Sequence, residues 1–249
     1  MNRVENIQRD GKPVAGAERG NTRAITPGCV LISSVLAVKE DSAGIDRTVR
    51  SASSAEVPEL AAVLSRAFAN EPPFTWVQPD DVLRARVQPA MFHGALRYVY
   101  PVERGTEVLL GNGSILGGAI WAPPGRWKAP PWQRLRVIPG LIRALSIRHF
   151  RQYAQRGKAV EDALHRAHPS DPHWYLAMLG TDPQAQGKGV GSALVRSGLE
   201  RCDRDGEHAY LECLEPLVPY YERFGFEIIG KIQMPEEVPD QVSMWRVQR

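Results

Sequence analysis

Cysteine is scarce in this chain of 249 residues, which contains three: Cys29, Cys202 and Cys213. An odd number without C-x-x-C spacing excludes a disulfide framework and a zinc ribbon, and because the histidines lack metal-ligand spacing we expect no metal. The apolar stretch 29–38 is too short to span a bilayer, and it lies too far behind mixed charges for a signal peptide. These absences predict a cytoplasmic protein without a membrane partner.

Acidic residues are missing from one long segment, Val108 to Val160, although the formal net charge of the chain is only +3. Nine lysines and arginines fall in this segment, so we expect it to carry positive potential. One interpretation is a solvated helical face whose partners come from elsewhere in the fold; attraction of an anionic ligand is another. The arginines follow no nucleic-acid-reading motif, and no nucleic-acid partner is predicted.

Residues 176–192 (LAMLGTDPQAQGKGVGS) combine an apolar strand, a turn and a glycine-rich helix start. The pattern Gln186-x-x-Gly189-x-Gly191 places small residues where backbone N–H groups converge at the positive end of a helix. Apolar residues then recur at helical spacing, so the helix can pack one face on a sheet. The segment therefore predicts a phosphate-binding loop.

Two familiar nucleotide motifs do not fit this loop. A Walker loop needs Ser or Thr after Gly-Lys, whereas Gly187-Lys188 is followed by Gly189. A dinucleotide fingerprint needs a third glycine that this chain lacks, and no suitable acidic residue closes a following strand. What remains is Gln-x-x-Gly-x-Gly behind a strand that ends in 180–183 (GTDP).

A second landmark lies downstream, where 210–213 (YLEC) precedes 219–226 (PYYERFGF). With the loop, these pieces resemble the GNAT superfamily of N-acyltransferases, closest in pattern to the puromycin N-acetyltransferase type, which also has the Trp-x-Leu strand found at 174–176. The resemblance covers roughly residues 48–249. It implies an α/β fold with a central mixed, mostly antiparallel sheet of about seven strands, splayed between strands four and five and flanked by helices.

The same resemblance implies acetyl-CoA as cosubstrate. Pantetheine would thread the gap between strands four and five beside Leu179, Gly180 and Thr181, and the pyrophosphate would meet the loop, whose members are Gln186, Gly187, Lys188, Gly189, Val190, Gly191 and Ser192. The alternative for the loop is a purely structural helix cap.

By resemblance, Glu212 would act as the general base, directly or through water, and Tyr221 would face the thioester sulfur. The alternatives are an exposed or ion-paired strand carboxylate and a packed helical aromatic. An ordinary glutamate with a pKa of ~4.3 faces ~6 units, or about 8 kcal/mol, against a lysine-like ammonium. A primary amine of low pKa is therefore the expected acceptor, and Tyr221 is expected to donate a hydrogen bond to developing charge rather than a full proton.

The chain departs from the puromycin-type pattern, because Cys213-Leu214 and Leu217-Val218 stand where that pattern has Thr-Ser and an Asn-containing turn. This leaves a more apolar pocket and removes support for an antibiotic acceptor. Five aromatic residues in the loops and lid helices could line the acceptor site: Phe74, Trp76, Trp121, Trp127 and Tyr153. Core or lid packing is the alternative for all five, and it is the expectation for Trp121.

Periodicity and turn signals predict the remaining elements. We expect strands at 48–50, 107–110, 114–121, 173–181, 209–213, 227–233 and 241–247, and helices at 56–68, 80–98, 132–145, 147–168, 187–204 and 217–224. Residues 1–46 should form a flexible extension, and 47–249 a single domain with a helical lid at about 131–168.

The expected activity is transfer of an acetyl group to a primary amine of a small molecule, by direct attack within a ternary complex. Two alternatives stay open: acetylation of a protein N-terminus or lysine, and a noncatalytic acyl-CoA sensor. The enzyme could be a monomer or a homodimer.

Overall fold

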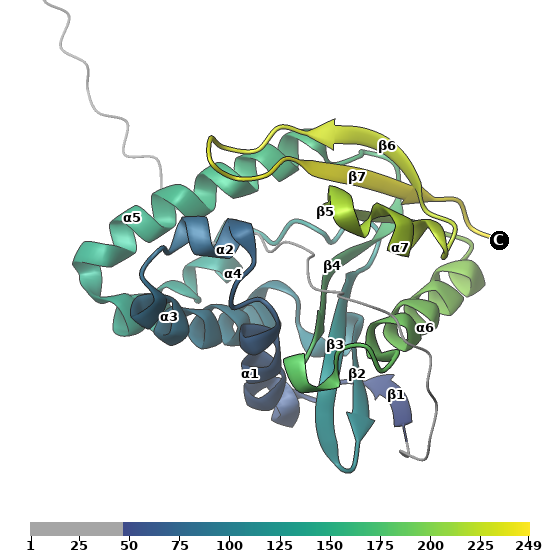
Figure 1. The fold of residues 1–249 in the computed structure, drawn as a ribbon, viewed down its shortest axis with the longest axis horizontal. Coiled ribbons are helices and arrows are strands. Elements are labelled where there is room, and N and C mark those ends of the chain that lie inside the picture. The colour runs from purple at the N-terminus through teal and green to yellow at the C-terminus, as the bar shows by residue number, and fades with distance from the viewer. Residues whose placement is uncertain (1–46) are drawn as a thin grey trace, which may run out of the picture.

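A computed structural model describes residues 47–249 of the protein. Cys29 and the extension expected over residues 1–46 lie outside the described residues. One seven-stranded sheet runs through the described part, with strand order β1-β2-β3-β4-β5-β7-β6 (Figure 1). The strands are β1 Arg47–Ser51, β2 Thr106–Gly111, β3 Ser114–Ala122, β4 His173–Thr181, β5 His208–Leu214, β6 Glu227–Ile232 and β7 Gln241–Arg246.

Every neighbouring pair of strands in this sheet is antiparallel except β4 and β5, which run parallel. The parallel pair requires a crossover connection, and helix α6 (Val190–Asp205) supplies it. The expected fold class, a mixed and mostly antiparallel sheet opened between the fourth and fifth strands, is confirmed.

Helices cover both faces of the sheet (Figure 1). One face carries α6 and the short α7 (Val218–Glu222), which pack around Leu194, Val195 and Tyr221. The other face carries α1 Val57–Ala67, α2 Pro72–Val77, α3 Asp81–Gly94, a π-helical continuation Ala95–Val99, α4 Pro131–Leu135 and α5 Ile138–Ala167. Short 3-10 turns occupy Ser54–Glu56, Val102–Arg104, Pro183–Ala185 and Glu215–Leu217. Of the helices within 47–249, none is both long and apolar enough to cross a membrane.

The close packing of α6 on the sheet depends on Gly198. A Cβ atom on Gly198 would lie 2.2 Å from two atoms of the Trp121 indole, which is itself 1% exposed. The helix therefore approaches β3 closely enough to bury that indole completely, and Trp121 belongs to the core rather than to an acceptor pocket.

Three local expectations need correction. Residues 72–77, expected as loop, form α2, because prolines at the first two positions of a helix lose no hydrogen bond there. The helix expected at 132–145 is two helices, α4 and the start of α5. Helix α6 begins at Val190 rather than at 187, because Gly187 and Gly189 adopt left-handed conformations with φ of 74° and 76°. The expected break near residue 146 is present as a kink at Ser146.

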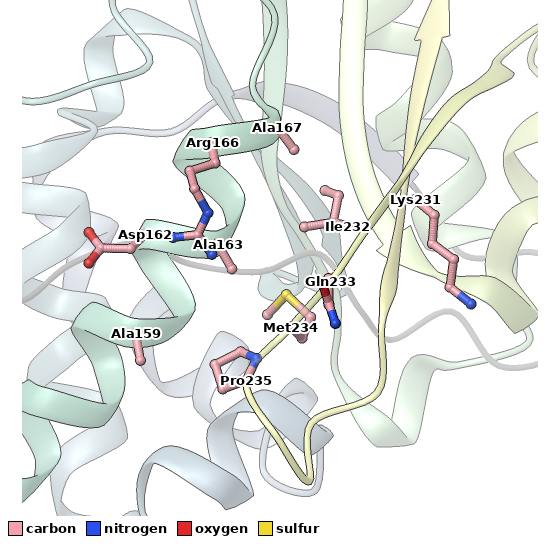
Figure 2. Close-up of a pocket in the computed structure, with 10 residues that line it drawn as sticks. All are labelled: Ala159, Asp162, Ala163, Arg166, Ala167, Lys231, Ile232, Gln233, Met234 and Pro235. Atoms are coloured by element: carbon pink, nitrogen blue, oxygen red, sulfur yellow. The ribbon is translucent and has the colours of Figure 1, made fainter. Parts of the chain in front are cut away.

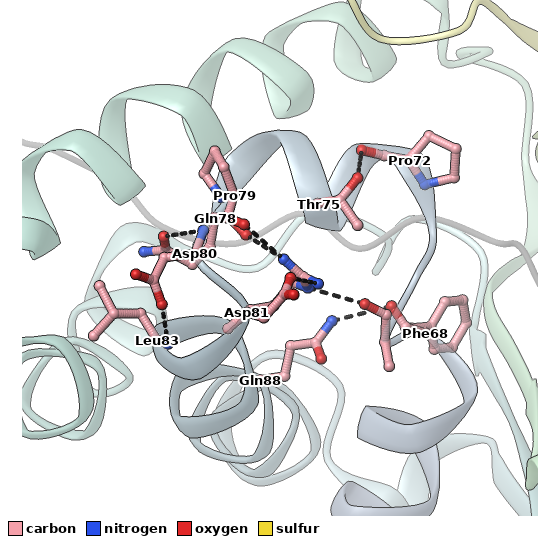
Figure 3. Close-up of polar contacts among 11 residues, drawn as sticks. Phe68, Pro72, Thr75, Gln78, Pro79, Asp80, Asp81, Leu83 and Gln88 are labelled. Carbon is pink, nitrogen blue, oxygen red and sulfur yellow. Dashed lines mark hydrogen bonds and ion pairs between the residues drawn. The ribbon is translucent and has the colours of Figure 1, made fainter.

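Arg84 of α3 holds the connection between α1 and α3 in place. Figure 3 shows the polar contacts of this region, with Gln78, Pro79 and Asp81 among the labelled residues. The buried guanidinium of Arg84 donates to the backbone carbonyls of Ala69, Gln78 and Pro79 and pairs with Asp81. A planar group with five N–H donors can satisfy several carbonyls at once, which a lysine ammonium cannot do in the same geometry. The segment that includes α2 is thereby fixed against the rest of the helical layer.

Gly198→Ala is expected to destabilise the protein by about 1–3 kcal/mol, because the added methyl group overpacks against Trp121. Gly157→Ala is the matched control: it also replaces a helical glycine, but its Cβ meets open space. The control should stabilise by roughly 0.5–1 kcal/mol. Urea denaturation of both variants measures the difference; equal effects at the two positions would contradict the close packing of α6.

Candidate active site

The site is organised by the separation of β4 from β5. The two strands pair only at His173–His208, Trp174–Ala209 and Tyr175–Tyr210, and beyond these pairs each strand keeps only its outer neighbour. The β3–β4 register shifts by one residue next to this point, so β4 bulges at Ala177. Because a bulge bends and twists its strand, it turns β4 away from β5. Backbone groups on the inner edges of both strands therefore face a gap.

The glycine-rich loop lies at the far end of β4. Gly187 and Gly189 provide two left-handed turns, after which the N–H groups of Val190, Gly191 and Ser192 form the first turn of α6. A Cβ atom on Gly189 would meet nothing within 4 Å, so the approach to this turn is open. The positive end of a sixteen-residue helix with open approach fits an anionic pyrophosphate.

The side chains of Asp182 and Lys188 form polar contacts that hold the loop. Asp182 accepts a hydrogen bond from the backbone N–H of Gln184 and forms an ion pair with Arg66 of α1, with a distance of 2.6 Å. Lys188 donates to the carbonyl of Gln184. The loop is therefore held at a fixed position relative to the helical layer that contains α1.

Glu212 lies in the middle of β5 and is fully buried. Leu211 and Cys213 point to the α6 side of the sheet, so the alternation of a strand directs Glu212 to the opposite side, toward the end of α5. Neither of its carboxylate oxygens accepts a hydrogen bond from any described residue. A buried carboxylate without hydrogen-bond donors is costly, so Glu212 is a group whose burial the described residues do not compensate by hydrogen bonds.

His168, directly after α5, is the group nearest to this carboxylate. Its Nδ1 atom lies 3.4 Å from Glu212 Oε1, an ion-pair distance without the alignment of a hydrogen bond, and both side chains are almost inaccessible to solvent. The imidazole stacks on Trp127 and is 3.1 Å from the Nε2 atom of His173. Burial lowers the pKa of His173 to about 4, so this ring is neutral near pH 7.

Tyr221 of α7 lies on the α6 side and is fully buried. Its hydroxyl has no hydrogen-bond partner among residues 47–249. Burial raises its pKa well above the usual value, and the nearby charge of Glu71 adds to this effect. The phenol is therefore protonated and has a hydrogen available to donate. The hydroxyl oxygen of the neighbouring Tyr220 lies 3.4 Å from Ser192 Oγ at the loop.

The residues predicted to contact the acceptor lie in two different parts of the structure. Phe74 and Trp76 of α2 pack against a small apolar cluster that joins α5 to the loop between β6 and β7. The guanidinium of Arg156 lies over the Trp76 ring. Tyr153 is buried in the main core, where burial raises the pKa of its hydroxyl.

Some of the basic residues between 108 and 160 have identifiable roles within the fold. Arg134 of α4 forms a buried ion pair with Glu161, whose pKa is raised by burial to about 7 despite that partner. Lys158 pairs with Asp162 one turn further on, and Arg136 lies over the Trp132 ring. The Arg134–Glu161 pair joins two helices and matches the interpretation in which partners come from elsewhere in the fold, whereas the other two pairings are local.

Three polar residues near Glu212 had no distinguishing signal in the sequence. His168 and His173 belong to different elements and meet only because the chain turns from α5 into β4. Gln241, at the start of β7, is also fully buried, and its amide has no hydrogen-bond partner within the described chain. Its strand partner is Leu214, two residues after Glu212, so Gln241 and Glu212 share one face of the sheet.

This geometry defines a class of protein: an α/β fold with a glycine-rich helix terminus, two parallel strands that separate, and one buried carboxylate and one buried phenol on opposite sides of the sheet. Comparison with known proteins agrees. The model of the Acetyltransferase (GNAT) family matches residues 138–226, which include the loop, Glu212 and Tyr221.

Solved structures extend the match beyond that region. One match is the crystal structure described as histone acetyltransferase HPA2 and related acetyltransferase from Corynebacterium glutamicum. Its sequence is 30% identical to this chain and the TM-score is 0.63; the alignment covers 82% of this chain and 97% of that one. Arylalkylamine N-acetyltransferase 2 from Aedes aegypti aligns over 82% of this chain and 100% of its own at 14% identity and a TM-score of 0.55. An N-acetyltransferase from Staphylococcus aureus Mu50 shares the fold at 16% identity, with a TM-score of 0.54 and coverage of 80% and 99%.

The chain belongs to the GNAT family of acetyltransferases. Enzymes of this family generally transfer an acetyl group from acetyl-CoA to an amino group.

Tyr221→Phe is expected to stabilise the protein by about 1 kcal/mol, because it deletes a buried hydroxyl that has no hydrogen-bond partner in the described structure. Tyr220→Phe is the control: it deletes a hydroxyl that lies close to Ser192, and should be neutral or destabilising by up to about 1 kcal/mol. Urea denaturation in the absence of acetyl-CoA checks both. Destabilisation by Tyr221→Phe would show that its hydroxyl has a structural partner.

Proposed function

We propose that the protein transfers an acetyl group from acetyl-CoA to a primary amine of a small molecule, by direct attack of the amine within a ternary complex. The observation that carries this proposal is the fully buried carboxylate of Glu212, which accepts no hydrogen bond from the described residues and lies on β5 just beyond its last pair with β4. We place the enzyme in the cytoplasm, where acetyl-CoA is available.

The proposed acetyl-CoA site has two parts, the inner edge of β4 and the glycine-rich loop. The inner edge of β4, with Leu179, Gly180 and Thr181, would bind pantetheine. The loop would bind the pyrophosphate through backbone N–H groups, with the remaining contacts from Gln186, Gly187, Lys188, Gly189, Val190, Gly191 and Ser192. Acetyl-CoA supplies the activated acyl group, and the chain supplies position and proton transfer.

Glu212 and Tyr221 then divide the proton chemistry. Glu212 accepts a proton from the attacking nitrogen, and the Tyr221 hydroxyl donates a hydrogen bond to the departing sulfur. They approach the gap from opposite sides of the sheet, which suits groups that act on opposite ends of the reacting bonds. Cys213 is the nearest thiol in sequence, and burial raises its pKa to about 12, so it is a poor covalent nucleophile.

The acceptor would enter from the α5 side. A groove of about 580 Å³ runs between α5 and the end of β6, lined by Ala163, Ile232 and Met234 among others (Figure 2). Ile232 pairs with Gln241, so the groove lies on the same face of the sheet as Glu212. Phe74 and Trp76 pack at the apolar cluster beneath it, and with Tyr153 they are our proposed acceptor-binding residues.

A low-pKa amine is the acceptor that this site would serve best. It is partly neutral near pH 7, so the carboxylate removes a proton at little cost, whereas a lysine-like ammonium adds several kcal/mol. The motif likeness to puromycin N-acetyltransferases supports a small amine in general and not puromycin in particular.

Acetylation of a protein is the second candidate, favoured by one observation. The Corynebacterium glutamicum structure, similar to this chain at 30% identity, is described as a histone acetyltransferase HPA2 and related acetyltransferase. The exposed cations of the α5 region argue for small or acidic acceptors instead, because a basic surface repels basic peptides.

Release of free thiol from acetyl-CoA, measured against a panel of amines, tests the proposal. The panel contains amino acid amides, simple alkylamines of higher pKa, puromycin and a lysine-rich peptide. We expect amine-dependent release with a higher kcat/KM for the low-pKa amines, and Glu212→Gln should lower kcat by about 10²–10⁴-fold while acetyl-CoA still binds. Tyr221→Phe should lower kcat more than it weakens acetyl-CoA binding.

Three other results of this assay would contradict parts of the proposal. Equal kcat/KM for amines of low and high pKa would refute the low-pKa acceptor, and preference for the peptide would favour the protein acetyltransferase. Saturable acetyl-CoA binding without thiol release for any amine would favour a noncatalytic sensor.

A further inference from the structure

A series of close contacts leads from Glu212 through two histidine side chains to the exposed residue Asp171. His168 Nδ1 lies 3.4 Å from Glu212 Oε1, His168 Nε2 lies 3.1 Å from His173 Nε2, and His173 Nδ1 lies 2.6 Å from the backbone oxygen of Asp171. Asp171 is exposed. Three groups that are each no more than about 3% exposed thus connect the centre of the sheet to its rim.

The far end of this route determines which ring nitrogens are protonated. A backbone carbonyl only accepts hydrogen bonds, so His173 Nδ1 must be the donor to Asp171. Neutral His173 then has a bare Nε2, and the short contact with His168 requires the hydrogen to be on His168 Nε2. A second bare nitrogen at this distance would place two lone pairs against each other.

The same logic applies at the Glu212 end. If His168 were neutral with its hydrogen on Nε2, its bare Nδ1 would face a carboxylate oxygen, which is repulsive. A proton on either of the two facing atoms removes this repulsion, either on Nδ1 beside a carboxylate or on the carboxyl beside a neutral ring. In both arrangements Glu212, His168 and His173 together carry no net charge, which a buried site favours.

We propose that Glu212, His168 and His173 act as one neutral proton-holding unit, in which the two histidines position the base and pass its proton to solvent beside Asp171. This inference rests on the proposed role of Glu212. In one turnover, which starts with the shared proton on His168 Nδ1, the attacking nitrogen gives a proton to the Glu212 carboxylate, His168 gives its Nε2 proton to the bare Nε2 of His173, and His173 releases its Nδ1 proton to water. Both rings then hold the opposite tautomer, and a flip of each ring restores the starting arrangement. One proton enters and one leaves, so the buried charge does not change.

The surroundings support this role. Trp127 stacks on His168 with ring centroids 3.7 Å apart, and Tyr175 and Tyr210 meet the ring edge-on, so water cannot readily replace the imidazole. The other titratable or charged groups near the unit lie on its margins: Lys128 and His165 beside Trp127, and Asp171 and His208 beside His173.

The first test observes the protons directly in the wild-type enzyme without acetyl-CoA. Long-range ¹H–¹⁵N spectra of the imidazole groups at pH 7 distinguish the two ring nitrogens. We expect His173 with its proton on Nδ1 and His168 with a proton on Nε2. A His173 ring that carries its proton on Nε2 alone would overturn the proposal, whether or not any variant folds.

The second test uses His168→Phe, which retains an aromatic ring against Trp127, and His168→Ala, which leaves space for added imidazole. Both should lower kcat/KM by about tenfold to hundredfold and alter its pH profile, with acetyl-CoA affinity unchanged. Imidazole should restore part of the activity of His168→Ala. His93→Ala, at an exposed position of α3, is the control and should match the wild type.

The outcomes separate this inference from the proposed function. Loss of activity in Glu212→Gln with full activity and an unchanged pH profile in His168→Phe would leave Glu212 as a base and refute the histidine route. Full activity in both would refute the role of Glu212 itself and, with it, this inference.

Discussion

The parting of two parallel strands is the constraint on which this structure depends. Three residue pairs join β4 to β5, and after Tyr175 and Tyr210 a bulge in β4 ends the ladder. Backbone groups that a sheet normally satisfies internally are thereby left for a ligand, at a depth where side chains are fully buried. The glycine-rich loop follows the end of β4, and Glu212 and Tyr221 lie on opposite faces of the sheet, so the roles proposed for all three depend on this opening.

Much of the fold could be predicted from the sequence, because its signals are local. The hairpin at residues 111–113, the glycine-rich loop and the strand that precedes it each depend on a few adjacent residues. The errors were local too: consecutive prolines at 72–73 look like a chain break, yet they are tolerated in the first turn of α2. Helix α6 begins three residues later than predicted, because Gly187 and Gly189 adopt left-handed backbone conformations before the helix starts.

The candidate site was less predictable, because its important contacts join residues distant in sequence. Resemblance to a family pointed to Glu212 and Tyr221, but neither the burial of the carboxylate nor its missing partners is visible in the sequence. The approach of His168 to Glu212 depends on where a kinked helix ends relative to β5. Gln241 is a similar case, since its position follows only from strand register.

The anchoring of α2 by Arg84 has a consequence for how such an enzyme acquires new acceptors. The segment that bears Phe74 and Trp76 is attached to the helical layer through the backbone carbonyls of Ala69, Gln78 and Pro79, and not through β5 or α7, which carry Glu212 and Tyr221. Side chains of this segment can therefore be exchanged without loss of the anchor, because carbonyl acceptors are common to all residues. Under the proposed function, a change of acceptor would then leave the residues proposed for the transfer chemistry in place.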